Sequence, residues 1–286
     1  MRTYIPVLSI AGSDSSGGAG IQADIKTISA LGCYAMTAIT AITAQNTMGV
    51  LDIQGIDTSI VRAQIDAVFT DVPPLAVKTG MLHNAEIVEC VAEKMQQYSV
   101  NTLVIDPVMV STSGSMLLSD DAVNLMTGKL FPLATLVTPN RMEALRLTGT
   151  EDVNEQARVL SEMGCRNILL KGGDSDDNNV KVDYLKLSTE PELIALRADA
   201  VDTNNTHGTG CTLSSAIASY LAMGLDIEDA CIRAKLYITR ALAAGARIMS
   251  GHGHGPVNHL FGPRHMKYLN IDSNGNYIKQ QKNYRR

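Results

Sequence analysis

The amino-acid sequence predicts an α/β protein, a three-layer α/β/α sandwich in which helices cover both faces of a mostly parallel central sheet. Apolar runs of strand length alternate with segments whose apolar residues recur at helical spacing, which is typical of a parallel sheet buried on both faces. The chain has 286 residues, of which 45% are hydrophobic and 19% charged, so it can bury a large core. No repeat, low-complexity tract or linker divides it, and residues 1–270 are expected to form a single domain.

The N-terminal third shows the alternation most clearly. A β-rich apolar run over 5–11 predicts the first strand, and it breaks at a glycine-rich segment. Helical spacing predicts a helix over 21–31 that stops at a glycine, and a second strand is expected over 34–43. A helix over 58–69 follows, with Thr58 as its expected N-cap.

The same alternation continues to the end of the expected domain. Strands are expected over 75–79, 103–105, 136–138 and 168–170, a helix over 85–98, a hairpin or edge pair over 180–187 and 193–198, and two long helices over 211–223 and 227–249. The polar residues 271–286 are expected to form a frayed tail.

Composition and charge exclude several function classes. Lys and Arg number 24 against 29 Asp and Glu, for a formal net charge of −5, whereas proteins that grip a nucleic-acid backbone are usually basic. Aromatic residues make up 4% and Trp is absent, which argues against stacking on single-stranded bases. We therefore expect no nucleic-acid partner, and an anionic ligand must be held by local features such as helix N-termini.

The cysteines and the apolar runs predict a reduced, cytoplasmic setting. Five cysteines are spread along the chain, and no two of them form a C-x-x-C pair, so neither a disulfide framework nor a zinc ribbon is expected. The N-terminal apolar run is too short and too weakly charged for a signal peptide and is interpreted as a strand. No stretch approaches the roughly 18 apolar residues of a membrane span.

Polar residues and glycines follow the expected strands, at the points where those strands end. They are Ser13-Asp14, Gln45-Asn46, Gly80-Met81, Asp106, Asn140 and Lys171. Ligands of open parallel sheets bind beyond the carboxyl ends of the strands. Any one of these breaks could be an ordinary turn, but six at one rim predict a ligand site there.

The glycine-rich segment at 17–20 can be interpreted in more than one way. Gly18-x-Gly20-x-x-Ala23 fits the dinucleotide pattern, but the acidic residue that should hold the ribose is missing after the next strand, so an NAD site is not expected. The glycines can instead allow close packing, or let a small substrate approach the backbone. In the second case Asp24, one turn into the helix, would point at that substrate.

The segment over 202–214 carries the strongest local signal. Gly208-Thr209-Gly210 opens directly into an apolar helix, where unpaired amides and the helix dipole favour an anion such as a phosphoryl group. Cys211 lies at the same helix start, a position that typically lowers a thiol pKa. The alternative is a glycine-rich helix cap with a structural cysteine.

This segment resembles the hydroxymethylpyrimidine and phosphomethylpyrimidine kinases of thiamine biosynthesis, within the ribokinase-like superfamily. The matching stretches run in family order and cover nearly the whole chain. They are IAGSDSSGGAGIQADIKT at the start, TAITAQNT at 40–47, AVKTGM at 76–81, VIDPVMVSTSG at 104–114, VTPNRMEA at 137–144, LLKGGD at 169–174 and NTHGTGCTLSSAIASYL at 205–221.

The resemblance implies a role for each site residue. Gln45 and Asp24 would hydrogen-bond the aminopyrimidine ring, with Met81 and Val108 as apolar walls. The polar set Asp106, Asn140 and Glu143 would orient Mg²⁺ waters and ATP phosphates, with Lys171 as a cation near those phosphates. Gly208, Gly210 and Cys211 would form the anion hole, and Cys211 occupies the place at which most of the superfamily has an aspartate base. The reaction would transfer the ATP γ-phosphoryl group to the pyrimidine and then to its monophosphate, with ATP and Mg²⁺ as cofactors.

Several alternatives stay open at this point. A pyridoxal kinase, a catalytically silent binder that acts as a sensor, and a cysteine hydrolase using Cys211 with His207 all fit parts of the sequence. The histidines of GHGHGPVNH over 251–259 could bind zinc, but a glycine-rich turn is favoured and no protein-only metal site is expected. The superfamily often dimerises, so a homodimer is expected.

Overall fold

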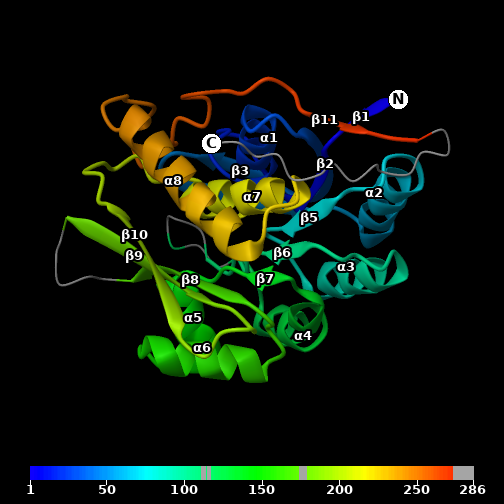
Figure 1. The fold of residues 1–286 in the computed structure, drawn as a ribbon, viewed down its shortest axis with the longest axis horizontal. Helices are drawn as coiled ribbons and strands as arrows, with labels where there is room; N and C mark the ends of the chain where they lie inside the picture. Colours follow the sequence, from blue (N-terminus) through cyan, green and yellow to red (C-terminus); the bar gives the residue numbers. More distant parts are fainter. Residues whose placement is uncertain (111–113, 115–116, 174–178, 273–286) are drawn as a thin grey trace.

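The computed structural model describes residues 1–110, 114, 117–173 and 179–272 (Figure 1). Over these residues the chain forms a nine-stranded sheet in the order β10-β9-β8-β7-β6-β5-β2-β3-β4 and a separate two-stranded sheet of β1 and β11. From β3 through β8 neighbouring strands run parallel, whereas β4 and β9 are antiparallel to their neighbours. The sheet is therefore mostly parallel, as the sequence predicts.

The strands of the large sheet follow the alternation of the sequence. They are β2 (Pro6–Asp14), β3 (Tyr34–Asn46), β4 (Gly49–Gly55), β5 (Ala76–Thr79), β6 (Leu103–Ile105), β7 (Leu136–Val137), β8 (Ile168–Gly173), β9 (Val180–Lys186) and β10 (Leu193–Asp199). The two-stranded sheet joins β1 (Arg2–Tyr4) to β11 (Tyr268–Asn270) and ties the two ends of the described chain together.

Helices cover both faces of the sheet. They are α1 (Gly20–Ala30), α2 (Thr58–Asp71), α3 (Ala85–Gln97), α4 (Asp120–Leu125), α5 (Arg141–Thr148), α6 (Val153–Glu162), α7 (Thr209–Ala222) and α8 (Ile227–Gly245), with a π-helical turn and a 3₁₀ turn, η1 (Met126–Leu130) and η2 (Phe131–Leu133), after α4. One core lies under α2 to α6 and the other under α1, α7 and α8.

Side-chain alternation along each strand divides the core into these two halves. In β6, Leu103 and Ile105 belong to the core under α2 to α6, whereas Val104 between them belongs to the core under α7 and α8. Successive strand residues point to opposite faces, so a three-residue strand contributes to both cores. The three-layer α/β/α architecture predicted from the sequence is thus confirmed.

Some element boundaries differ from the expected ones. The cap of α2 is Asp57 rather than Thr58, because the Asp57 carboxylate accepts a hydrogen bond from the Ser59 amide at 2.8 Å. Helix α8 ends at Gly245 instead of residue 249, and the glycine-rich stretch after it forms bends. Residues 273–286 of the expected tail lie outside the described residues. None of the described helices is long and apolar enough to span a bilayer.

Candidate functional site

A cavity of about 890 Å³ opens at the carboxyl ends of the parallel strands. The predicted site residues that line it come from β3, from the segments after β5, β6 and β7, from β8 and from the start of α7. They are Gln45, Met81, Asp106, Val108, Asn140, Glu143, Lys171, Gly208, Gly210 and Cys211. The topology therefore brings together ten residues that are scattered over 167 positions of sequence. Of the predicted site residues, only Asp24 does not line this cavity.

The start of α7 forms one wall of the cavity. Gly208 adopts φ +83° and precedes the helix, and no side chain caps the first turn. A Cβ at this position would overlap the carbonyl oxygen of Gly18, so the close approach of the two loops requires glycine. The Thr209 amide donates to the Thr206 carbonyl at 3.2 Å. The amides of Gly208, Gly210 and Cys211 stay at the positive end of the helix dipole, an arrangement that typically binds anions. We call Gly208–Cys211 the anion-binding turn.

A buried ion pair lies directly against the anion-binding turn. Lys171 Nζ is 2.6 Å from Asp106 Oδ1, and Ser214 of α7 donates a hydrogen bond to Asp106 Oδ2 at 3.2 Å. Burial opposes ionisation of Asp106, but Lys171 and then Lys78 outweigh it and lower its pKa. A Cβ on Gly210 would stand 3.4 Å from both Asp106 Oδ2 and Lys171 Nζ. The turn thus has a fixed cation beside it.

Asn140 and Glu143 form a reciprocal cap at the start of α5. The Asn140 side chain accepts from the Glu143 amide at 2.9 Å, and Glu143 Oε2 accepts from the Asn140 amide at 2.8 Å. Such a capping box fixes both side chains at the helix start. Burial raises the pKa of Glu143 to about 7, although Lys171 and the amides of Asn140 and Met109 act in the opposite direction. The carboxyl is therefore poised to change charge near neutral pH.

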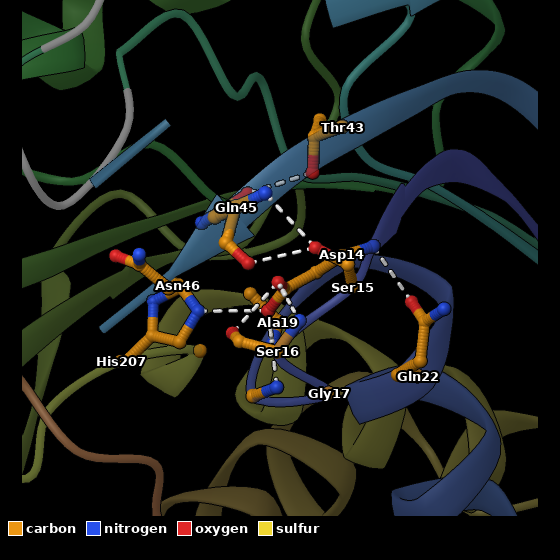
Figure 2. A network of polar contacts seen from close by, with 12 residues as sticks. Asp14, Ser15, Ser16, Gly17, Ala19, Gln22, Thr43, Gln45, Asn46 and His207 are labelled. Atoms are coloured by element: carbon orange, nitrogen blue, oxygen red, sulfur yellow. Dashed lines mark hydrogen bonds and ion pairs between the residues drawn. The ribbon is translucent and has the colours of Figure 1, made fainter. Parts of the chain in front are cut away.

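Gln45 lies at the other end of the cavity and is the next-to-last residue of β3. Its Oε1 accepts a hydrogen bond from the Thr43 hydroxyl at 3.1 Å, and its backbone amide donates to Ser15 Oγ at 2.9 Å (Figure 2). No other described residue hydrogen-bonds the Gln45 side chain. The amide nitrogen is thus available to a ligand in the cavity, whose wall also includes the apolar side chains of Met81 and Val108.

The structure contradicts the expectation that Asp24 points at the substrate. Its side chain is completely buried in α1 and is paired with Lys78 Nζ at 2.9 Å, so it does not point at a substrate. Ser9 and Ser215 also donate hydrogen bonds to its two oxygens, at 2.5 and 2.7 Å. The expectation failed because Asp24 faces the sheet, where β5 supplies a lysine. The one signal in the sequence was Lys78 itself, a charged residue in an apolar strand.

The thiol of Cys211 also differs from its expected state. Its thiol was expected to have a lowered pKa at the helix start, but burial raises this pKa to about 11. Lys78 and the Gly20 amide lower it, whereas Asp24 and Asp106 raise it. Desolvation therefore outweighs the helix position. The thiol is protonated at neutral pH, and the main-chain amide is the part of Cys211 that can bind an anion.

Sequence reasoning missed the role of Asp14. This carboxylate accepts hydrogen bonds from the amides of Gly18 and Ala19 at 3.0 and 2.8 Å, and its Oδ2 lies 2.8 Å from His207 Nε2 (Figure 2). Burial opposes ionisation, but the hydrogen bonds from His207, Ser16 and Ala19 lower the Asp14 pKa to about 2. The pair fastens the glycine-rich loop after β2 to the segment before α7, so it holds the anion-binding turn in place.

The same pair weakens the cysteine hydrolase alternative. His207 is engaged by Asp14 rather than by Cys211, so the nucleophile–base contact of that mechanism is not formed. The histidines over 252–259 also do not gather. His254 Nδ1 contacts the Asn204 carbonyl at 3.2 Å, and His259 is buried with its pKa lowered by burial to about 4. Within the described residues, no three His, Cys, Asp or Glu side chains cluster as metal ligands.

Comparisons with known proteins agree with this geometry. A thiamine biosynthesis bifunctional protein of Geobacter sulfurreducens is 47% identical over 264 residues, covering 89% of this chain, and the chain spans about half (52%) of that longer protein. A hydroxymethylpyrimidine/phosphomethylpyrimidine kinase of Rhizobium meliloti is 45% identical over 88% of this chain and 96% of its own length.

A solved structure has the same fold. The pyridoxal kinase of Staphylococcus aureus in complex with AMP-PCP and pyridoxal superimposes with a TM-score of 0.80 at 32% identity, over 90% of this chain and 94% of that one. The family model described as phosphomethylpyrimidine kinase matches residues 14–258, which include every residue of the site described above. The chain therefore belongs to the phosphomethylpyrimidine kinase family, on a ribokinase-like fold.

Proposed function

We propose that the protein transfers the γ-phosphoryl group of ATP to 4-amino-5-hydroxymethyl-2-methylpyrimidine and then to the resulting monophosphate, in thiamine biosynthesis. The observation that carries this proposal is a single cavity with the anion-binding turn on its wall, a hydrogen-bonding glutamine at one end and the Asp106–Lys171 pair at the other. The relatives that cover nearly all of this chain are kinases of the same two compounds, which supports the substrate assignment.

The pyrimidine end of the cavity is formed by Gln45, Met81 and Val108. A carboxamide offers a donor and an acceptor, which matches the donor–acceptor edge of an aminopyrimidine. Gln45 Oε1 is oriented by Thr43, so its amide nitrogen is presented to a ring nitrogen of the substrate. Met81 and Val108 would pack on the two faces of the ring. Asp24 has no part in this contact.

The nucleotide end is formed by Asp106, Asn140, Glu143 and Lys171. Lys171 would neutralise charge on the ATP phosphates, because its pKa is raised by Asp106 and Glu143 against the effect of burial and its ammonium stays charged. Asp106 and Glu143 supply the carboxylate oxygens that Mg²⁺ prefers, and both line the cavity. These two side chains would hold Mg²⁺ through its water ligands, and the ion would supply charge neutralisation of the transferred group.

The transfer itself relies on charge stabilisation more than on a strong base. Phosphoryl transfer passes through a loose transition state, so most of the rate comes from positioning and from neutralising the equatorial oxygens. The amides of Gly208, Gly210 and Cys211 would hydrogen-bond those oxygens. The hydroxyl proton leaves late, when the new P–O bond is largely formed, and would pass to an oxygen of the transferred phosphoryl group as ADP departs. The protonated Cys211 thiol therefore does not prevent the reaction.

One assay tests the activity. Release of ADP is measured with the pyrimidine, its monophosphate and pyridoxal offered separately, each with and without Mg²⁺. We expect turnover with the first two compounds and loss of turnover in EDTA. Activity on pyridoxal alone would replace the proposal with a pyridoxal kinase, as in the staphylococcal structure. Binding without turnover of any compound would favour a silent sensor.

Two further properties belong to this proposal. We place the enzyme in the cytoplasm, which suits five unpaired cysteines. We also propose a homodimer, because the edge strand β4 and its surroundings expose large apolar side chains, with Leu51 78% and Met48 64% exposed. Sedimentation velocity of the parent and of Leu51→Lys tests this. A parent that sediments as a monomer at micromolar concentration would contradict the homodimer.

A further inference from the structure

A completely buried lysine lies behind the cavity, and the proposed reaction leaves it without a role. Lys78 lies on β5, in the middle of a strand whose other residues are apolar or hydroxylic, and its side chain is completely buried. Its Nζ contacts both carboxylate oxygens of Asp24, at 3.0 and 2.9 Å. Burying a lysine is costly, and Lys78 is one of the largest fully buried side chains among the described residues.

The pair has a defined orientation relative to α7. The Asp24 carboxylate is fixed by the hydroxyls of Ser9 in β2 and Ser215 in α7. The Lys78 ammonium lies toward the end of β5, where a Cβ on Gly80 would come within 2.9 Å of Nζ. Gly80 is followed by Met81, which lines the cavity. The carboxylate is therefore held against β2 and α7, and the ammonium lies beside Gly80, in the segment that leads from β5 to the cavity wall at Met81.

The charges around Cys211 support this orientation. Four charged groups act on its thiol: Lys78 from β5, Asp24 from α1, Asp106 after β6 and Lys171 from β8. The effect of Lys78 on the Cys211 pKa is larger than that of Asp24. Lys78 also lowers the pKa of Asp106, although burial is the largest influence on that group. Lys78 thus places a positive charge close enough to the anion-binding turn to act on both Cys211 and Asp106.

We propose that Lys78 is a positioning residue for phosphoryl transfer, whose ammonium, fixed by Asp24 behind the first turns of α7, presents a permanent positive charge to the anion-binding turn. A preorganised charge of this kind stabilises the negative charge that the transferred group carries, without reorganisation during the step. Lys78 does not line the cavity among the described residues, so it acts through the turn. The inference deepens the proposed kinase function and rests on it.

The two singly charged variants and the neutral pair test the proposal. Lys78→Met leaves the Asp24 charge behind the turn, Asp24→Asn leaves the ammonium, and Lys78→Met/Asp24→Asn removes both. In single-turnover transfer we expect Lys78→Met to lose about 100-fold in rate, the double variant about 10-fold, and Asp24→Asn the least, with KM for both substrates nearly unchanged. A double variant as fast as the parent, or equal losses in the two single variants, would overturn the proposal.

A second readout does not depend on turnover. The rate of iodoacetamide alkylation at Cys211 at one mildly alkaline pH, followed by mass spectrometry of its peptide, reports the thiolate fraction. We expect this rate to fall in Lys78→Met and to rise in Asp24→Asn. A purely structural role would change it in the same direction in both variants, which would refute the proposal. If instead the kinase activity fails in the parent, the opposite changes at Cys211 would still be measurable, so the two failures are distinguishable.

The chain contains a matched control. Lys94 of α3 is also buried and paired with an aspartate, Asp66 of α2, at 2.6 Å, but it does not line or approach the cavity. Lys94→Met should lower the stability of the protein while the transfer rate and the Cys211 alkylation rate stay at the parental values. A comparable rate loss in Lys94→Met would mean that Lys78→Met acts through stability alone, and the proposal would fail.

Discussion

Gln45 combines a fixed acceptor with an open donor at the pyrimidine end of the cavity. Replacing it by Leu should lower kcat/KM for the pyrimidine by about 10- to 100-fold, because a buried hydrogen bond to substrate contributes about 1–3 kcal/mol. The KM for ATP should stay nearly constant. Steady-state kinetics with each substrate varied in turn measure both values. Gln54→Leu, an exposed glutamine on the neighbouring strand β4, is the matched control and should leave both unchanged.

Glu143 carries a prediction about pH and stability. Its carboxyl has a pKa of about 7 in the folded protein against an ordinary value of 4.5, so folding favours the protonated form. The stability that this provides is complete below pH 4.5 and is lost as the pH rises through 7. In urea denaturation, Glu143→Gln should therefore gain stability relative to the parent between pH 5 and pH 8.5, by at most about 3 kcal/mol. A difference that does not vary with pH would contradict the raised pKa.

Single residues show where sequence reasoning succeeds and where it stops. The strand-end residues Gln45, Asp106, Asn140 and Lys171 could be predicted to meet, because parallel strands end at one edge of the sheet. The pairing of Asp24 with Lys78 could not, because it depends on which face of α1 meets β5. The thiol pKa of Cys211 was predicted in the wrong direction, since a helix start is visible in the sequence but the depth of burial is not.

Among the elements, α7 depends most on one backbone conformation. Gly208 and Gly224 both adopt a positive φ, +83° and +87°, one before and one after the helix. A Cβ on Gly224 would meet nothing within 4 Å, whereas a Cβ on Gly208 would overlap the Gly18 carbonyl. Both Ala variants should lose about 1 kcal/mol of stability to backbone strain, and Gly208→Ala should lose more, because the overlap with the Gly18 carbonyl must also be relieved. Only Gly208→Ala should also lose transfer rate, by roughly 100-fold or more, because it displaces amides of the anion-binding turn.

The transfer rates of the two glycine variants can contradict this prediction in two ways. Equal transfer rates in Gly208→Ala and Gly224→Ala, in spite of a larger loss of stability in Gly208→Ala, would mean that the turn does not bind the transferred group. A small loss of rate in both would point to general loosening of α7 instead. Circular dichroism of each variant separates these outcomes from a failure to fold.

The regular elements were predictable to different degrees. The strand over 103–105 and the pair β9 and β10 were predicted within a residue or so, because short apolar runs between turn residues leave few alternatives. The edge strand β4 was not predicted, because its sequence GVLDIQG is half polar and its pairing with β3 is set by the turn between them. Helices α4 and α6 were also missed, since α4 has only six residues and α6 buries only two apolar side chains, Ala157 and Leu160.

At the scale of the whole molecule, the cavity follows the carboxyl ends of the parallel strands across most of the width of the sheet. Its lining runs from the loop after β2, through the segments that follow β5, β6 and β7, to β9 and α8. No single element could bind either ligand, so an occupant binds only the folded chain and must stabilise it. The fold class was predictable from strand–helix alternation, but the depth of this cavity depends on how the loops pack. The contact of Asp14 with His207, far apart in sequence, is one example.

The two ends of this cavity should therefore be separable by thermal unfolding. A ligand at about 100 times its Kd contributes about 2.7 kcal/mol, which corresponds to an increase in Tm of roughly 5 °C for a chain of this length. We expect the pyrimidine and an ATP analogue each to raise the Tm of the parent. Gln45→Leu should lose the shift with the pyrimidine and keep the shift with the nucleotide. Lys171→Met should do the reverse, because it removes the cation beside Asp106 and leaves the pyrimidine end intact.

Each shift is measured against the same variant without ligand, so a lower starting Tm does not affect the comparison. If both variants lost both shifts, the cavity would act as one site and the division into a pyrimidine end and a nucleotide end would be wrong.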